Sequence, residues 1–270
     1  MTGAGPGSIG RAVADALRGE GWDVVVTTRS EPVEGHVWQP LDLADRGSVA
    51  RLAEWYDDRA DRLDLLVNSA GIHLDLGSRW TSPQLLDGHE IHWRTNYLGT
   101  VDLTTALLPS LLAAADAHGD ARVLHVVSRL HERGTVEALL GTASSYDSWV
   151  AYGTSKLGLV HHAAALDEQY ADRGLRALAV HPGAVSTGIA DRGLETRPVL
   201  RRLRRLAQPL ERRVLMSPAD SAAHLVRLAT DPDTVAGYHH KSKPVPPSPA
   251  AVDLTARAEL SVRTAAWLAG

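Results

Sequence analysis

Residues 2–10 read TGAGPGSIG and lead directly into the helical pattern RAVADAL at 11–17. Within this stretch, Gly5 to Gly10 match G-x-G-x-x-G, and an apolar run, WDVVVTT, follows at 22–28. Glycines permit a tight turn and let backbone N–H groups approach a pyrophosphate at the N-terminus of the following helix. The stretch therefore predicts a dinucleotide-binding unit. The alternative is a flexible, glycine-rich N-terminus.

The strand that should precede such a loop is missing, since only Met1 stands before it. The first strand is normally central in a sheet of this kind. Its absence predicts a hole in the sheet, and we expect that the start codon is assigned too late or that the chain is truncated.

Strand-like and helix-like segments alternate along the rest of the chain, which is typical of a parallel sheet covered by helices. The predicted strands are 22–28, 41–43, 63–67, 122–127 and 176–181, and the predicted helices are 11–17, 46–59, 90–112, 150–170, 217–230 and 250–268. We expect an α/β fold with a Rossmann-type, doubly wound parallel sheet that lacks its first strand.

The length of 270 residues fits one domain over 1–270. Between Asp191 and Arg213 there are eight Arg against three acids. We interpret this segment as the solvated face of a substrate lid at about 188–215; the alternative is a basic helix on a membrane surface.

Composition excludes several function classes. A net charge of −4 gives no electrostatic footprint for nucleic acid. There is no cysteine and no His-Glu-x-x-His pattern, so we expect no metal site, and the lack of thiols fits a cytoplasmic protein. No apolar run approaches the ~20 residues that span a bilayer.

The end of the second predicted strand bears on the choice of cofactor. Arg29 stands there, where an acidic residue would bind the 2′-hydroxyl of NAD. An arginine favours the 2′-phosphate of NADP, and Arg11 could assist it. The alternative is a solvated arginine at a strand end. We expect NADP, with NAD second.

The pattern Tyr152-x-x-x-Lys156 predicts acid/base chemistry. On a helix these side chains lie on one face, a turn apart. A free phenol titrates near ~10, and a neighbouring cation lowers its pKa toward the working range. Ser128 ends the fifth predicted strand. Asn96 lies on a long predicted helix where a buried amide needs partners, so it is either a structural bridge or part of a proton relay. The alternative is a surface tyrosine beside a solvated lysine.

Taken together, these motifs resemble the short-chain dehydrogenase/reductase family over essentially the whole chain. They stand in the family's order: the glycine-rich loop 2–10, Asp42-Leu43, Asn68-Ser69-Ala70-Gly71, Asn96, Ser128, Tyr152 with Lys156, and Pro182-Gly183. The Ser-to-Tyr loop and the Pro-rich tail look most like the retinol-dehydrogenase-like branch. The glycine loop is one residue longer than usual, and Ser69 stands where the family has Asn.

The resemblance implies hydride transfer between a nicotinamide and a carbonyl or alcohol substrate. It implies that Tyr152 is the acid/base, that Ser128 places the substrate oxygen, that Lys156 tunes Tyr152 and binds the ribose, and that Asn96 holds a water. The implied cofactor-binding residues are Gly3, Gly7, Ser8, Ile9, Gly10, Arg29, Asp42, Leu43, Asn68, Ala70, Gly71, Tyr152, Lys156, Pro182, Gly183, Val185 and Thr187. A homo-oligomer is a family expectation. The competing hypothesis is a catalytically impaired dinucleotide-binding or scaffold protein.

Overall fold

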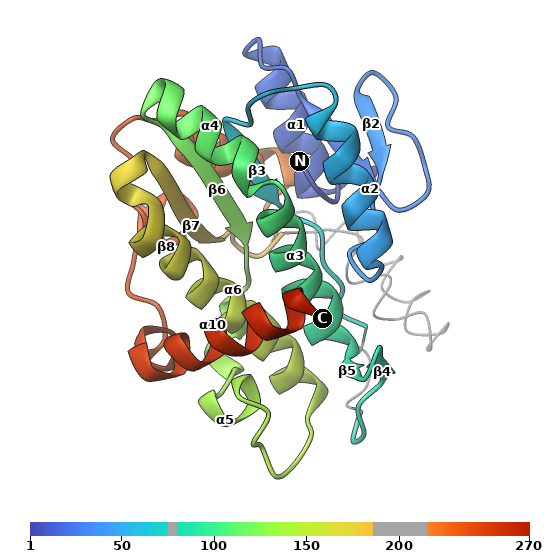
Figure 1. The fold of residues 1–270 in the computed structure, drawn as a ribbon, viewed down its shortest axis with the longest axis vertical. Helices are drawn as coiled ribbons and strands as arrows, with labels where there is room; N and C mark the ends of the chain where they lie inside the picture. Colours follow the sequence, from blue (N-terminus) through green and yellow to red (C-terminus); the bar gives the residue numbers. More distant parts are fainter. Residues whose placement is uncertain (75–79, 186–214) are drawn as a thin grey trace.

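The computed structural model describes residues 1–74, 80–185 and 215–270 (Figure 1). Three sequence predictions lie wholly or almost wholly outside these ranges: Thr187, the lid at 188–215 and the Arg-rich segment 191–213.

A mostly parallel sheet forms the centre of the molecule, as predicted. Five strands run in the order β3-β6-β7-β8-β9, and β1 and β2 form a parallel pair beside them. Only β9 is antiparallel to its neighbour in this sheet. The bounds are Val25–Thr28 (β1), Val37–Pro40 (β2), Leu65–Asn68 (β3), Ala121–Val126 (β6), Leu175–His181 (β7), Gly237–His240 (β8) and Lys243–Pro244 (β9); Leu85–Leu86 (β4) and His89–Glu90 (β5) form a separate small hairpin.

The first residues of the chain join the two groups of strands. The Met1 α-amine donates to the Val25 carbonyl at 2.9 Å, and Thr27 N–H donates to the Met1 carbonyl at 3.0 Å. On the other side, Thr2 N–H donates to the Val67 carbonyl at 3.0 Å. Residues 1–4 therefore lie between β1 and β3, where a central strand is expected.

A small cavity lies beside Met1. It has a volume of about 110 Å³ and opens between the amino-terminal ends of β1 and β3. Its lining is mostly apolar and includes Leu17, Trp22, Val24, Leu65, Leu66, Leu103 and Leu107. Burial of the Met1 α-amine at this position lowers its pKa to about 5.

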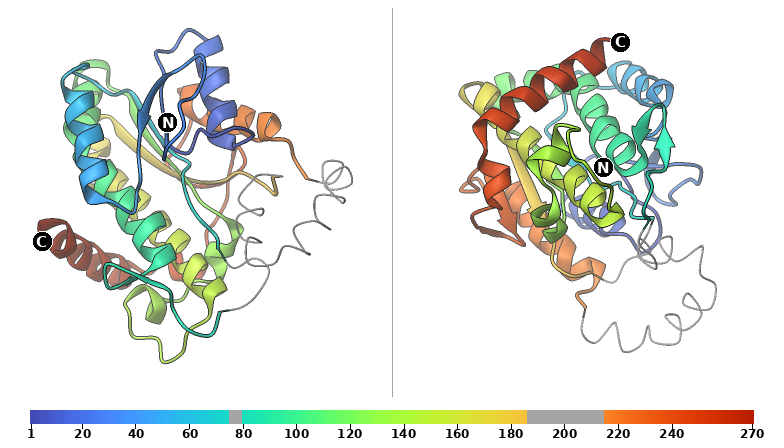
Figure 2. Two further views of the ribbon diagram at one scale, coloured as in Figure 1. Left: turned by 90° about the vertical axis from the view of Figure 1, so that its right-hand side faces the viewer. Right: turned by 90° about the horizontal axis from the view of Figure 1, so that it is seen from below.

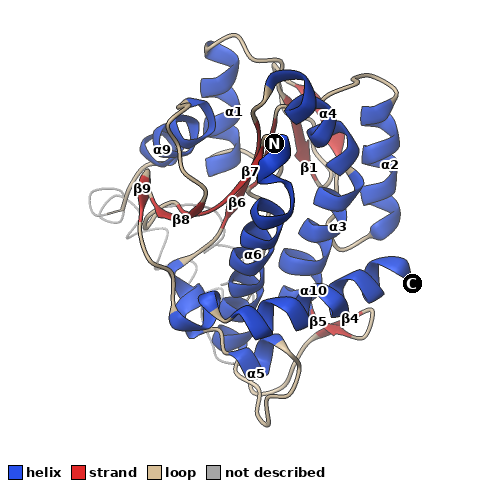
Figure 3. Ribbon diagram, turned by 60° about the vertical axis from the view of Figure 1, so that its left-hand side comes forward, coloured by secondary structure: helices blue, strands red, loops and turns tan. Residues whose placement is uncertain are grey.

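Helices cover both faces of the sheet (Figures 2 and 3). Side chains alternate between the faces along each strand: Ala177 and Ala179 pack on one side, Leu178 and Val180 on the other. The first core is built with α2, α3, α4, α6 and α10, and the second with α1 and α9. The helices are Ile9–Gly19 (α1), Arg46–Asp57 (α2), Gly99–Ala106 (α3), Leu108–His118 (α4), Val136–Leu139 (α5), Ser148–Tyr170 (α6), Pro218–Thr230 (α9) and Leu254–Ala269 (α10), with a π-helix at Trp93–Leu98 (η1) and 3₁₀ turns at Arg129–Arg133 (η2), Ala171–Arg173 (η3) and Pro249–Val252 (η4).

The sequence prediction was wrong in three places. The helix expected over 90–112 is η1, α3 and the start of α4, with a 54° bend between α3 and α4. The strand expected at 41–43 ends at Pro40, because the Asp42 side chain turns the chain by accepting from Ala44 N–H at 2.9 Å. Strand β8 was missed because its sequence, GYHH, is short and carries no apolar run. Within the described ranges, no single helix is long and apolar enough to cross a bilayer; η1–α3 and α4 meet that length and composition only as a bent pair.

Candidate active site

A cavity of about 560 Å³ lies at the carboxyl ends of the strands. Fourteen of the predicted site residues line it: Gly3, Ser8, Ile9, Arg29, Asp42, Leu43, Ala70, Gly71, Ser128, Tyr152, Lys156, Pro182, Gly183 and Val185. Four others, Gly7, Gly10, Asn68 and Asn96, are not part of its wall. The fold thus brings the glycine loop and the Tyr152 helix to one cavity.

The glycine loop is shaped by close backbone contacts. Gly3 has φ of +69°, and a Cβ there would lie 2.8 Å from Ala70 Cα. A Cβ on Gly10 would lie 2.8 Å from the Gly3 carbonyl oxygen, so Gly10 allows α1 to pack on the loop. Gly7, at φ +69°, has open space around it. Only glycine combines these properties without strain.

The N-terminus of α1 is suited to an anion. Ser8 is the N-cap, and its hydroxyl accepts from Arg11 N–H at 3.0 Å. No acidic residue stands in the first turn, so the positive end of the helix dipole is not neutralised there. Both Ser8 and Ile9 line the cavity. The open loop and this helix end together fit the pyrophosphate of a dinucleotide.

The two arginines proposed for cofactor choice lie in different settings. Arg29 is exposed and lines the cavity just after β1. Arg11 instead points along α1 and pairs with Asp15 at 2.9 Å, and Asp15 also contacts His36. Of these two arginines, only Arg29 lines the cavity.

Tyr152, Ser128 and Lys156 line one wall of the cavity. Burial raises the pKa of Tyr152 to about 12, opposed only in part by its hydrogen bond with Ser128. Burial also lowers the pKa of Lys156 to about 8. The Lys156 ammonium donates to the Val126 carbonyl at 3.2 Å and lies 5.9 Å from the Tyr152 ring centroid. The net shift of the Tyr152 pKa is therefore upward, opposite to the predicted lowering, because desolvation of the phenol dominates.

Asn96 is buried inside the π-helix η1, outside the cavity wall. Its Oδ1 accepts from Ile72 N–H at 2.8 Å, and its Nδ2 donates to the Ile72 carbonyl at 2.9 Å and to Ser155 Oγ at 3.2 Å. A Cβ on Gly71 would lie 3.2 Å from Lys156 Nζ and 3.3 Å from Asn96 Oδ1. Glycine at this position lets the chain pass between the two side chains. π-helical turns are frequent at functional sites.

Asn68 belongs to a buried polar chain behind the cavity. Its Nδ2 donates to Thr104 Oγ1 at 3.0 Å and lies 3.2 Å from His125 Nδ1. Because the amide nitrogen can only donate, His125 Nδ1 accepts and its Nε2 donates to His162 Nδ1 at 3.0 Å. Asn68 of β3 therefore links α3 and β6 and does not lie at the cavity surface.

One end of the cavity depends on residues that the sequence did not reveal. Arg94 is 1% exposed and donates to the carbonyls of Leu43 and Ala44 at 3.0 and 2.9 Å. Its guanidinium also lies 5.1 Å from the ring centroid of Trp267 in α10. Arg94 thus links the C-terminal helix to the loop that carries Asp42 and Leu43. Its Nε also pairs with Asp87 at 3.1 Å, but no local motif identifies Arg94, since Leu43, Ala44 and Trp267 are all 50 or more residues away in the sequence.

Comparisons with known proteins show which family the chain resembles. A model of the short chain dehydrogenase family matches residues 1–197. Mouse polyprenol dehydrogenase is 33% identical over 219 residues, which cover 79% of this chain and 62% of that protein. Mouse retinol dehydrogenase 13 is 30% identical over 203 residues, covering 69% of this chain and 58% of that protein. The chain belongs to the short-chain dehydrogenase/reductase family.

Solved structures show the same fold. An uncharacterized protein from Mycobacterium paratuberculosis has a TM-score of 0.68 at 27% identity, covering 99% of this chain and 91% of that one. The Pseudomonas aeruginosa protein RhlG, solved as an NADP active-site complex, has a TM-score of 0.62 at 22% identity, covering 88% and 91%. These neighbours support the predicted Rossmann-type sheet. The chain spans 43% to 62% of the length of the first curated relatives that it matches.

Proposed function

We propose that the chain is an NADPH-dependent reductase of carbonyl groups, with Tyr152 as the proton donor. The observation that carries the proposal is a single cavity: Tyr152, Ser128 and Lys156 line it together with the glycine loop and Arg29. When bound, NADPH supplies the hydride. This chain's own residues bind it, place the carbonyl and deliver the proton.

The protonation state of Tyr152 favours reduction. With its pKa raised to about 12, the phenol keeps its proton at neutral pH and is ready to donate it to a developing alkoxide. The Ser128 hydroxyl, hydrogen-bonded to Tyr152, holds the substrate oxygen at the same point. With a pKa of about 8, Lys156 is mostly cationic at pH 7, so its charge favours the phenolate that remains.

Arg29 supports NADPH over NADH. It is exposed at the end of β1 and lines the cavity, so an incoming 2′-phosphate would gain a charge-assisted contact. The NADP complex of a structural neighbour is consistent with this choice. Asp42, Leu43, Ala70, Gly71, Pro182, Gly183 and Val185 complete the proposed cofactor wall.

The substrate proposed is an apolar aldehyde or ketone. Ile72, Leu74, Leu86 and Ile91 line the cavity and offer no charge to a ligand. The two mouse relatives are named for retinol and polyprenol, both apolar alcohols. A cytoplasmic location, one domain with a lid at about 188–215 and a homo-oligomer remain part of the proposal.

The experiment is cofactor binding by the purified chain, followed by fluorescence of NADPH and NADH. We expect NADPH to bind at least 30-fold more tightly. Arg29→Asp should lose about 30-fold in NADPH affinity while NADH affinity stays within threefold, because a charge-assisted hydrogen bond contributes about 1.5–3 kcal/mol. The control Arg18→Asp makes the same change of charge at an exposed position of α1 and should leave the affinities for NADPH and NADH unchanged. Equal binding of NADPH and NADH by the unaltered chain would contradict the proposed preference.

A further inference from the structure

His73 lies flat against the ring of Tyr152. The two ring centroids are 4.0 Å apart, and the ring planes differ by 7°. His73 is 2% exposed, and Trp149 meets it edge-on at 5.1 Å between centroids. No sequence motif singles out His73, which stands two residues after Gly71. It contacts the proposed proton donor from a separate segment of the chain.

The backbone is fastened on both sides of His73. On one side Asn96 holds both Ile72 N–H and the Ile72 carbonyl. On the other side Leu74 N–H donates to His92 Nε2 at 3.1 Å. These three hydrogen bonds fix the residues before and after His73. The backbone that carries His73 is therefore held by Asn96 of η1 and by His92, the N-cap residue of η1.

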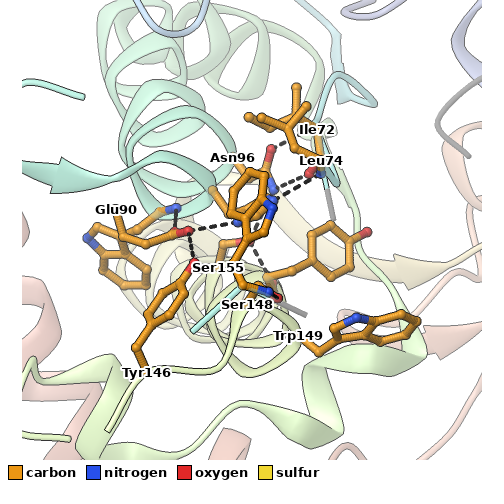
Figure 4. Close-up of polar contacts among 12 residues, drawn as sticks. Ile72, Leu74, Glu90, Asn96, Tyr146, Ser148, Trp149 and Ser155 are labelled. Atoms are coloured by element: carbon orange, nitrogen blue, oxygen red, sulfur yellow. Dashed lines mark hydrogen bonds and ion pairs between the residues drawn. The ribbon is translucent and has the colours of Figure 1, made fainter. Parts of the chain in front are cut away.

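His92 is itself held in one tautomer. Because its Nε2 accepts from Leu74, its Nδ1 carries the proton and donates to Glu90 Oε1 at 2.8 Å. Glu90 Oε1 also accepts from Tyr146 OH at 3.1 Å, and Glu90 Oε2 accepts from Trp93 N–H at 2.9 Å. Figure 4 shows Ile72, Leu74 and Asn96 on one side of this network, with Glu90 and Tyr146 on the other.

We propose that His73 is a positioning residue for Tyr152. Its backbone is held at the neighbouring residues Ile72 and Leu74, and its ring fixes the plane of the phenol and keeps water from the face of the phenol ring. A parallel contact of this kind stabilises one ring orientation. The hydroxyl is then directed toward Ser128, and burial keeps its proton in place. This inference rests on the proposed function of Tyr152 as proton donor.

The first test is kinetic, with NADPH and either decanal or 4-nitrobenzaldehyde as probe substrate. His73→Ala should lower kcat about 30-fold, while KM and the Kd for NADPH stay within threefold. His73→Phe keeps a flat ring and should stay within fivefold of the unaltered chain. The matched control is His239→Ala, since His239 is also 2% exposed but lies on β8, outside the cavity wall. It should leave kcat within twofold.

The second test follows the phenol directly and needs no turnover. Tyrosine labelled with ¹³C at Cζ reports the titration of Tyr152, assigned by the signal lost in Tyr152→Phe. Because burial raises the pKa of Tyr152, water entering beside the ring in His73→Ala should shift its titration downward by about one pH unit. His73→Phe and His239→Ala should titrate as the unaltered chain does.

The outcomes separate this inference from the proposed function. If the unaltered chain reduces neither probe, the proposed function is contradicted, and the ¹³C titration still decides the role of His73. If the chain turns over but His73→Ala leaves kcat within twofold and the titration unmoved, the positioning role is wrong. It is equally wrong if His73→Phe is as impaired as His73→Ala in kcat and in titration.

Discussion

The two ends of the central sheet are built from opposite kinds of residue. At the carboxyl ends of the strands, buried polar groups gather: Tyr152, Lys156, Asn68 and His125 are all under 7% exposed. At the amino ends of β1 and β3, mostly apolar side chains surround a cavity of about 110 Å³. One end of the sheet contains groups that are costly to bury, and the other end contains an apolar cavity.

The difference separates stability from chemistry within one sheet. The polar end contains charges and imidazoles whose pKa values are displaced by burial. Such displacements mark functional sites and lower the stability of the folded state. Substitutions at the apolar end should change the free energy of unfolding without changing turnover. Substitutions at the two ends should therefore act in different ways.

The largest expected effect is that of Lys156→Met at the polar end. Turnover should fall by about a thousandfold because the cation beside Tyr152 is lost. The free energy of unfolding at pH 7 should rise by about 2 kcal/mol, since burial of the charged lysine, which lowers its pKa to about 8, is no longer required. Urea unfolding and steady-state kinetics measure the two changes.

The pH dependence of this variant has a defined sign. Between pH 8 and 10.5 the folded lysine releases its proton while the unfolded lysine keeps it, so the cost of burial disappears as pH rises. The difference in the free energy of unfolding between Lys156→Met and the unaltered chain should therefore decrease over that range. The control Lys243→Met, at an exposed position of β9, should change neither stability nor turnover. Loss of both activity and stability at Lys156 would contradict the comparison.

At the apolar end, Leu103→Ala should reduce the free energy of unfolding by about 3 kcal/mol. Leu103 is fully buried beside the existing cavity, so the deleted atoms leave a larger void. The kcat of the folded enzyme should stay within twofold. Leu254→Ala, at a position 67% exposed, should reduce the free energy of unfolding by less than about 0.5 kcal/mol, because surface substitutions rarely change stability by more.

The smallest effect is acid destabilisation through His162. Burial lowers the pKa of His162 to about 4, so between pH 6.5 and 4 the unfolded chain binds a proton that the folded chain does not. Stability is then lost as pH falls through this window, by about 2 kcal/mol for this group. Urea unfolding at pH 7 and pH 4.5 should show a smaller loss for His162→Gln. His118→Gln, at a half-exposed position, should behave as the unaltered chain; an equal loss in His162→Gln would contradict this assignment.

The elements that could be predicted from the sequence are those determined by residues close together in the chain. The glycine loop, the helix around Tyr152 and the start of the helix at Ser217 all depend on neighbours within a few residues.

Prediction from the sequence failed where long-range contacts decide the result. Asn96 lies inside the π-helix η1, and its amide holds Ile72, which lies 24 residues away. Arg94 and His73 act through partners that no spacing reveals. The direction of the Tyr152 pKa was also missed, because the depth of burial cannot be known from a pentapeptide.

The most direct measurement is the transfer of deuterium from [4-²H]NADPH to a carbonyl probe by the unaltered chain and by Tyr152→Phe. The account predicts labelled alcohol from the unaltered chain. Tyr152→Phe should form it at least a thousandfold more slowly while binding NADPH within threefold of the unaltered affinity. Tyr152→Phe that forms labelled alcohol at an undiminished rate would contradict Tyr152 as the proton donor.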